Sequence, residues 1–327
     1  MSQGYKRIIV SRTDRIGDVV LSLPVFAAMK NCFPGIQTFA LVTDYTADVA
    51  RSSPRIDNVM TYDPNESIAR TSKKLKAVGA DAILVLFPRF KIAAASLLAG
   101  IPIRVGTAYR WYSFLFNKKV HEHRKMSVKN EADYNLSLVE ALGCSERILD
   151  ITLDTERSAS DRIAAFLNEN CLTNFIVVHP GSGGSAHDWS ADSFREMIKS
   201  AADNLSQNII VTGTEDERFL CKKVSEGISN AINTAGRFSM LEFMALVSKA
   251  GLFISNSTGP LHIAAAVGTP VIGLYPNKKP MTPVRWAPLT DKKIILTPGD
   301  GSDNLSMISV EEVLESIRQI IPSKRNE

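Results

Sequence analysis

Short apolar stretches alternate along the chain with helix-length segments in which apolar residues recur at helical spacing. Strands that follow one another through helices in this way form parallel sheets of βαβ units. The apolar stretches of the first half predict strands near Arg7–Ser11, Gln37–Val42, Asn58–Tyr62, Ala82–Phe87, Ile103–Thr107 and Lys119–Glu122. The segments between them predict helices around Asp18–Cys32, Ala47–Ser52, Ile68–Val78, Ile92–Leu98 and Glu131–Leu142.

A polar, charged stretch, Leu153–Ser160, precedes a second half in which the same alternation starts again. It predicts strands at Phe175–His179, Asn208–Thr212, Ala231–Asn233, Leu252–Ser255, Val271–Tyr275 and Lys293–Leu296. It predicts helices at Ala159–Glu169, Ala191–Asn204, Glu215–Gly227, Met240–Ala250, Leu261–Val267 and Val310–Ile321. We therefore expect an α/β protein of two doubly wound, Rossmann-like domains, residues 1–155 and 156–327, facing each other across a cleft at their strand ends.

Composition narrows the class of protein without naming a function. The chain has 327 residues, 45% hydrophobic and 22% charged, and a net charge of only +4, which argues against a nucleic-acid partner. Its longest apolar runs contain Gly and Pro and are short for a membrane span, and the first strand begins too early to leave room for a signal peptide. Four separated cysteines predict reduced core thiols in a cytoplasmic protein.

Positive charge is concentrated in one segment, Asn117–Lys129, which holds one acidic residue, Glu122. Aromatic residues lie just upstream, at Tyr109, Trp111, Tyr112, Phe114 and Phe116. A basic and aromatic segment suits an anionic acceptor or the anionic surface of a membrane. A solvated surface loop beside a partly buried strand explains the same composition equally well.

A small-residue turn, Asn256–Pro260, connects an apolar strand to a helix within Phe253–Tyr275. The free N–H groups of a helix N-terminus and its dipole make such a turn a site for a phosphate or diphosphate. Thr258 can add a hydroxyl donor, Gly259 allows close approach of the backbone, Pro260 suits the first helical turn, and His262 is placed to face the anion. The alternative is an ordinary strand-turn-helix in which His262 is merely packed.

Two further loops of the second half follow predicted strands. The Gly-rich loop His179–Ser185 offers backbone N–H groups and the hydroxyls of Ser182 and Ser185 to an anion. The loop Gly213–Glu217 places an acid, Glu215, where a ribose hydroxyl would lie. Three such loops at strand ends predict a nucleotide-diphosphate pocket. GxGxxG, a Lys-bearing P-loop and clustered metal ligands are all missing from the sequence, so we expect no dinucleotide, no metal and no other cofactor.

The first strand is followed by a loop rich in charge, Ser11–Asp18. It contains Arg12, Asp14, Arg15 and Asp18, more charge than a structural turn requires. A carboxylate at the edge of a cleft can act as a general base toward an acceptor hydroxyl. An acid in the first turn of a helix is also a common structural feature, so Asp18 has both interpretations open.

Three motifs resemble glycosyltransferase family 9, the ADP-heptose:lipopolysaccharide heptosyltransferases. They are RIGDVVLSLP at Arg15–Pro24, HPGSGGSAHDW at His179–Trp189, and STGPLHIAAAVGTP at Ser257–Pro270. The resemblance covers almost the whole chain. It implies a GT-B fold, an acceptor-binding first domain, a nucleotide-sugar-binding second domain, and an inverting transfer that needs no metal.

The resemblance also implies roles for individual residues. Asp18 matches the family's catalytic base, and the acceptor's acidic groups suit Arg12, Arg15 and Arg89. The residues expected around the donor are Ser182, Ser185, His187, Glu215, Met240, Thr258, Gly259, Pro260 and His262, with Met240 beside the adenine. Two positions depart from the family pattern: His187 stands where a lysine is frequent, and Ser257 where many members have aspartate.

The function implied by the resemblance is transfer of heptose from ADP-heptose to a lipopolysaccharide core, an anionic glycolipid. The enzyme would be cytoplasmic, with peripheral contact at the inner face of the inner membrane as one arrangement. Alternatives are another nucleotide-sugar, a different glycan or a protein as acceptor, or a nucleotide-sugar-binding protein without activity.

Overall fold

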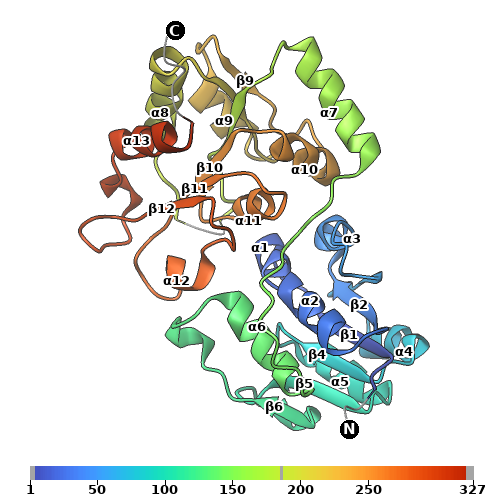
Figure 1. Cartoon of the computed structure of the whole chain (residues 1–327). Helices are drawn as coiled ribbons and strands as arrows, with labels where there is room; N and C mark the ends of the chain where they lie inside the picture. Colours follow the sequence, from blue (N-terminus) through green and yellow to red (C-terminus); the bar gives the residue numbers. More distant parts are fainter. Residues whose placement is uncertain (1–3, 185–186, 322–327) are drawn as a thin grey trace. The chain divides into compact units, whose positions relative to one another are not determined.

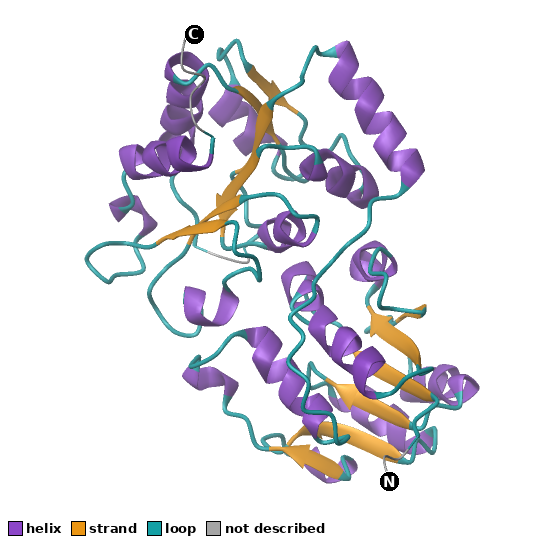
Figure 2. Cartoon of the chain, viewed as in Figure 1, coloured by secondary structure: helices purple, strands orange, loops and turns teal. Residues whose placement is uncertain are grey.

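The computed structural model describes residues 4–184 and 187–321. The chain divides into two compact units, Met1–Asp154 and Thr155–Glu327. Each unit contains a six-stranded parallel sheet with helices connecting its strands (Figures 1 and 2). The predicted α/β class is confirmed.

The first unit orders its strands β3-β2-β1-β4-β5-β6. The strands are β1 (Arg7–Ser11), β2 (Gln37–Val42), β3 (Asn58–Thr61), β4 (Ala82–Val85), β5 (Ile103–Thr107) and β6 (Lys118–Val120). The helices are α1 (Ile16–Val20), α2 (Leu23–Cys32), α3 (Ala47–Arg51), α4 (Ile68–Val78), α5 (Phe90–Leu98) and α6 (Glu131–Glu140), with 3₁₀ turns η1 (Asp44–Thr46), η2 (Ser113–Leu115) and η3 (Arg124–Met126).

The second unit repeats this arrangement in the order β12-β11-β10-β7-β8-β9. Its strands are β7 (Phe175–His179), β8 (Asn208–Val211), β9 (Ala231–Asn233), β10 (Leu252–Asn256), β11 (Val271–Leu274) and β12 (Lys293–Leu296). Its helices are α7 (Arg157–Glu169), α8 (Ala191–Asn204), α9 (Arg218–Ser225), α10 (Met240–Ser248), α11 (Gly259–Ala266), α12 (Pro283–Trp286), the 3₁₀ turn η4 (Leu305–Met307) and α13 (Val310–Ile320).

Both sheets have the strand order of a doubly wound fold. In such a sheet the connections leave in opposite directions on either side of the first strand, which opens a crevice at the carboxyl ends of the two central strands. The central pairs are β1 with β4 in the first unit and β7 with β10 in the second. The charged loop of the first unit follows β1, and the two loops with the strongest anion-binding features follow β7 and β10.

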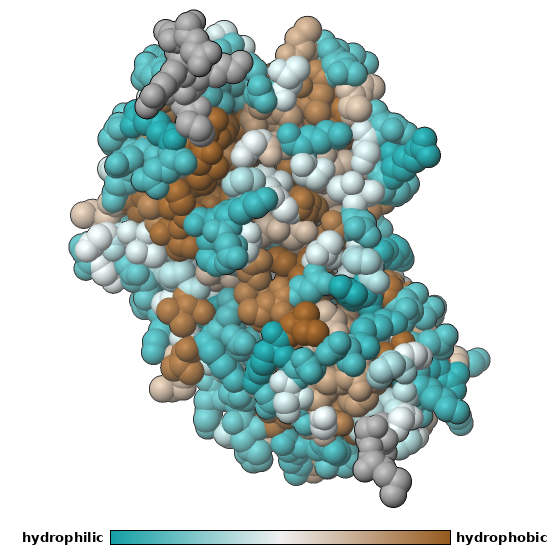
Figure 3. All heavy atoms as spheres, viewed as in Figure 1, coloured by the Kyte–Doolittle hydropathy of each residue, from teal (hydrophilic) through white to brown (hydrophobic). Residues whose placement is uncertain are grey.

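Burial on both faces explains the apolar strands. Ile8, Ile9 and Val10 of β1 and all five residues of β7 are buried, as expected when helices cover both faces of a parallel sheet. Gly106 in β5 shows how closely the layers pack, because a Cβ added there would lie 2.4 Å from the ring of Phe116. On the face shown in Figure 3, hydrophilic side chains cover most of the surface and hydrophobic ones emerge in separate patches.

The helix predicted over Asp18–Cys32 is wrong as a single element. It is two helices, α1 and α2, separated by Leu21 and Ser22. Pro24 lies in the first turn of α2, where the missing N–H is tolerated, whereas inside a continuous helix it would remove a hydrogen bond. The hydroxyl of Ser22 donates to the carbonyl of Val19 at 2.6 Å and so closes the end of α1.

The expectation of four reduced thiols in core positions is wrong. Cys32 and Cys144 form a disulfide, Cys171 is exposed, and Cys221 is a buried free thiol. Because α2 packs along α6, the end of α2 and the segment after α6 lie side by side, with the Cα atoms of Cys32 and Cys144 5.8 Å apart. Spacing along the chain therefore gave no basis for inferring a reducing compartment.

Within the described residues, no helix has the length and apolar character needed to cross a membrane.

Candidate functional site

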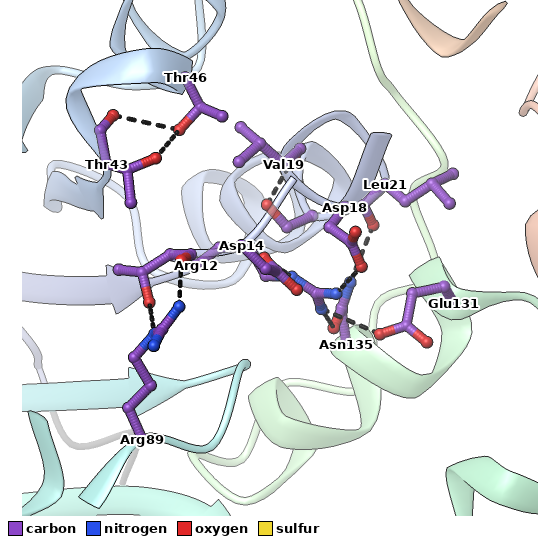
Figure 4. A network of polar contacts seen from close by, with 12 residues as sticks. Arg12, Asp14, Asp18, Val19, Leu21, Thr43, Thr46, Arg89, Glu131 and Asn135 are labelled. Atoms are coloured by element: carbon purple, nitrogen blue, oxygen red, sulfur yellow. Dashed lines mark hydrogen bonds and ion pairs between the residues drawn. The ribbon is translucent and has the colours of Figure 1, made fainter. Parts of the chain in front are cut away.

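The loop after β1 is organised around the buried guanidinium of Arg12 (Figure 4). Its Nε donates to Asp14 at 2.8 Å, and its Nη2 donates to Asp18 in the first turn of α1. Its Nη1 donates to Glu131 at 2.9 Å and to the side-chain oxygen of Asn135 at 3.0 Å, both on α6. One side chain thus connects the end of β1 to two helices.

Asp18 occupies an environment that favours its protonated form. Burial raises the pKa of the Asp18 carboxyl, Arg12 opposes that rise, and the nearby charges of Asp14 and Glu131 add to it, giving a pKa of about 7. A carboxyl with such a pKa is about half ionised near neutral pH, so it can take up or release a proton there. It therefore has the property required of a general base at that pH.

Glu131 extends the network beyond Arg12. Its side chain is fully buried, and the same oxygen, Oε1, that accepts from Arg12 also accepts from Arg124 of η3. Breaking a buried ion pair by removing one partner typically costs about 3–5 kcal/mol, because the other charge is left uncompensated. Glu131 is consequently needed to keep the buried Arg12 paired. Its position in the sequence, far from β1, gave no sign of this role.

The three predicted acceptor arginines have different positions. Arg12 directs each of its nitrogens to a partner inside the protein, which argues against the predicted acceptor contact. Arg89 is the N-cap residue of α5 and donates to the hydroxyl and the carbonyl of Thr13, in the loop after β1, at 2.8 and 2.9 Å. Arg15 is exposed at the start of α1. A contact with the acceptor stays a prediction for Arg15 and Arg89.

A pocket of about 310 Å³ opens in the first unit beyond β4, β5 and β6. Its lining includes Arg110, His123, Arg124 and Lys125 and one acid, Glu122. The ring of Tyr109 also lines it and stacks on His123, with ring centroids 3.9 Å apart. Part of the predicted basic and aromatic segment therefore lines a cavity in which basic side chains outnumber acidic ones. A larger hollow of about 510 Å³, beside α9 and β9, is lined by none of the predicted site residues.

In the second unit, Asn256 at the end of β10 joins two loops of the crevice. Its amide nitrogen donates to the carbonyl of Pro180, which follows β7, at 2.9 Å. Its side-chain oxygen accepts from the backbone N–H of Trp189 at 3.0 Å. The indole of Trp189 is buried and donates to the carbonyl of Ile308. Asn256 thereby holds Pro180 of the Gly-rich loop, and Trp189 beyond that loop, to the strand that leads into α11.

The turn after β10 has the predicted geometry of a helix N-terminus. Thr258 is the N-cap of α11, Gly259 and Pro260 are its first residues, and the hydroxyl of Thr258 lies 3.4 Å from that of Ser255. N–H groups in a first helical turn have no partner within the helix. His262 is the fourth residue of α11. Burial lowers its pKa to about 4, so the imidazole is neutral at physiological pH. Among the described residues, its Nδ1 is one of the few buried side-chain atoms without a hydrogen-bond partner.

Glu217 was missed by sequence reasoning. One of its oxygens accepts from the N–H of Gly183 at 3.1 Å, and the other accepts from the N–H and hydroxyl of Thr214 at 2.8 and 3.0 Å. Burial raises its pKa, but these hydrogen bonds and the nearby His179 bring the pKa below its usual range. The side chain lies over Gly181, where an added Cβ would be 2.0 Å from Oε1. Only tertiary structure brings these two loops together.

Other predicted donor residues are placed as follows. Glu215 is exposed and forms a bidentate ion pair with Arg218, which lowers the pKa of its carboxyl. Met240 is the first residue of α10 and is half-buried, as is Ser182, while His187 is exposed. Ser185 lies outside the described residues. In residues 4–184 and 187–321 no group of three His, Cys, Asp or Glu is placed to hold a metal ion.

Two doubly wound units, each with a crevice at the carboxyl ends of its central strands, are the architecture of the GT-B fold. The profile of glycosyltransferase family 9 (heptosyltransferase) matches residues 68–312. A Haemophilus influenzae protein assigned to the glycosyltransferases is 30% identical over 336 residues, covering 97% of both chains. The chain belongs to glycosyltransferase family 9 and is a glycosyltransferase.

Solved structures show the same fold. The family 9 glycosyltransferase of Veillonella parvula matches at a TM-score of 0.87 with 20% identity, covering 98% of both chains. The ADP-heptose LPS heptosyltransferase II of E. coli matches at a TM-score of 0.81 with 20% identity, covering 96% of this chain and 98% of that one.

The carboxyl of Asp18 should titrate with a midpoint near its pKa of about 7. It is protonated below that pH and ionised above it, because burial and two neighbouring carboxylates oppose its charge. The measurement is a ¹³C NMR titration of the aspartate carboxyl signals, with Asp18→Asn assigning the resonance. A midpoint near 4, the value of an ordinary aspartate, would contradict this environment.

Replacing Glu217 by Ala should free the Gly183 and Thr214 N–H groups and lower the free energy of unfolding by about 1–3 kcal/mol. Hydrogen exchange of those two amides should accelerate at least tenfold, and urea denaturation gives the stability. The matched control is Glu226→Ala, just after α9, where the carboxylate is exposed and pairs with Lys222 at 3.5 Å. Equal effects of the two variants would show that Glu217 does not hold the loops.

Proposed function

We propose that this glycosyltransferase transfers heptose from ADP-heptose to a lipopolysaccharide core acceptor, with inversion and without a metal ion. The observation that carries the proposal is Asp18, a carboxyl of raised pKa held by Arg12 at the crevice of the first unit. The heptose, the ADP and the lipopolysaccharide are supported by the family description and by the name of the E. coli structure of the same fold.

In the proposed reaction, Asp18 removes the proton of an acceptor hydroxyl as that oxygen attacks the anomeric carbon of the donor. The new bond joins the acceptor oxygen to the anomeric carbon, and the bond from that carbon to the diphosphate oxygen breaks. The proton remains on Asp18 and the electron pair leaves with ADP. A single displacement of this kind inverts the configuration at the anomeric carbon.

The leaving ADP needs stabilisation of its developing charge. The N-terminus of α11 supplies backbone N–H groups and the positive end of its dipole, and Thr258 supplies a hydroxyl. The neutral imidazole of His262, with its unpartnered Nδ1, is suited to donate to a phosphate oxygen. We assign Ser182, Ser185, His187, Glu215 and Met240 to the remainder of the donor site.

The acceptor is proposed to bind the first unit, with Arg15, Arg89 and the basic pocket beside β4 to β6 meeting its acidic groups. An acceptor built on a lipid would bring the enzyme to the cytoplasmic face of the inner membrane. We also propose that the first unit binds the acceptor and the second unit binds the nucleotide-sugar, as the resemblance to family 9 implies.

Calorimetric titration with ADP, UDP, GDP and NAD, in the absence of metal, tests the donor. We expect ADP to bind at least tenfold more tightly than the others, and Thr258→Val to weaken it about 3–10-fold by removing one hydroxyl donor. Thr173→Val, at an exposed threonine of the same unit, is the matched control. Preference for UDP or GDP would keep the glycosyltransferase and replace the donor, whereas no nucleotide binding would refute the proposed donor site.

Asp18→Asn tests the base. Transfer should fall by about 10²–10⁴-fold while the Kd for ADP stays within about twofold, because the amide cannot accept the proton. In the wild type, kcat/KM should fall about tenfold per pH unit below about 7, since the carboxylate is the active form. Asp44→Asn, at an exposed acid of η1, is the control. Near-normal turnover of Asp18→Asn would exclude Asp18 as the base.

A further inference from the structure

Exposed hydrophobic side chains are unevenly distributed in the described residues. Of the thirteen large ones that are exposed, eight lie between Phe90 and Val128. None of the proposed donor residues belongs to this segment. The concentration calls for an explanation, because single exposed apolar residues are normal on a protein surface but contiguous patches mark interaction sites.

The outward face of α5 is apolar. Ile92, Ala93, Ala95 and Ser96 are buried, and the opposite side of the helix carries Phe90, Ala94, Leu97 and Leu98, with Lys91 as its charged member. Leu98 is 66% exposed. A helix on the surface of a globular protein normally presents polar residues to solvent, so this face lacks its expected pattern.

The patch continues from α5 onto η2. The ring of Trp111 stacks on that of Phe90 with centroids 4.9 Å apart, and Trp111 is nevertheless 74% exposed. In η2, Ser113 and Leu115 are buried, whereas Phe114 between them is 68% exposed. We name the set Phe90, Leu97, Leu98, Trp111 and Phe114 the apolar patch.

Basic residues are frequent in the stretch of sequence that contains the apolar patch. The segment from residue 89 to residue 129 contains the basic residues Arg89, Lys91, Arg104, Arg110, Lys118, Lys119, Arg124, Lys125 and Lys129, and one acid, Glu122. Lys91 and Arg110 adjoin Phe90 and Trp111 in sequence, and Arg104 donates to the carbonyl of Leu115 at the end of η2. This excess of positive charge favours a partner with negative charge.

We infer that the apolar patch is the surface by which this protein docks on an anionic phospholipid bilayer, with Leu98, Trp111 and Phe114 entering the headgroup region. Apolar and aromatic side chains that enter the interface, with Lys and Arg around them, are the combination that holds a protein on an anionic membrane. A second copy of the chain fits less well, because pairing two such patches would bring like charges together.

This inference rests on the proposed function in one respect: the lipid-borne acceptor is the reason for the enzyme to meet a membrane. Docking itself involves no sugar transfer, and the apolar patch contains no residue assigned to the base, the donor or the acceptor. The two proposals can therefore fail separately. A soluble acceptor lacking its lipid should be used equally by wild type and by patch variants, whatever happens on vesicles.

The experiment is flotation of the full chain with vesicles of phosphatidylethanolamine and phosphatidylglycerol, and with vesicles of phosphatidylcholine alone. We expect binding to the anionic vesicles, at least tenfold weaker to the neutral ones, and a blue shift of tryptophan emission. The triple variant Leu98→Ser, Trp111→Ser, Phe114→Ser should lose at least tenfold in vesicle affinity. The single variant Phe114→Ser should lose a smaller part, which guards against a misfolded triple variant.

The matched control is Phe219→Ser, at a phenylalanine of the second unit that is 81% exposed. It should bind vesicles like the wild type. Failure of the wild type to bind anionic vesicles, or equal loss in the Phe219→Ser control, would overturn the inference. Sedimentation is measured in parallel, and a dimer that the triple variant abolishes would assign the apolar patch to a second copy instead.

Discussion

The guanidinium of Arg12 is a permanent positive charge enclosed by protein, and the first unit's site is arranged to neutralise it. An unpaired buried charge is unstable by several kcal/mol, so the guanidinium requires carboxylates in fixed positions. They come from the loop after β1, from α1 and from α6. The requirement therefore joins the end of the central strand to the helices that pack over it.

The same arrangement explains why Asp18 differs from an ordinary aspartate. Asp14, Asp18 and Glu131 gather around Arg12, with Arg124 reaching Glu131. Burial in this poorly solvated space raises the pKa of Asp18, Arg12 opposes the rise, and the nearby charges of Asp14 and Glu131 add to it. The loops of the second unit are organised mostly by neutral groups. The amide of Asn256 bonds to the carbonyl of Pro180 and to the N–H of Trp189, and the carboxylates of Glu217 and Asp188 also accept hydrogen bonds there.

Several features were within reach of the sequence because they depend on neighbours in the chain. The strands follow from apolar stretches, and the α11 turn follows from Thr258, Gly259 and Pro260 in succession. Pro24 contained the signal for the break between α1 and α2, and the prediction of one helix overlooked it. Arg12 shows another limit of the sequence: an arginine in a charged loop looks available to a ligand until its buried partners are known.

By itself, the sequence determined the α/β class, the two Rossmann-like halves, the family motifs and Asp18 as the candidate base, because local pattern and short motifs suffice for these. Only the tertiary structure decided what surrounds those residues. Glu131 lies over one hundred positions from Arg12, Glu217 is more than thirty from Gly183, and Cys32 meets Cys144 across 112 residues. Such contacts form when helices pack on a sheet, and the electrostatics that set a pKa act through space and not along the chain.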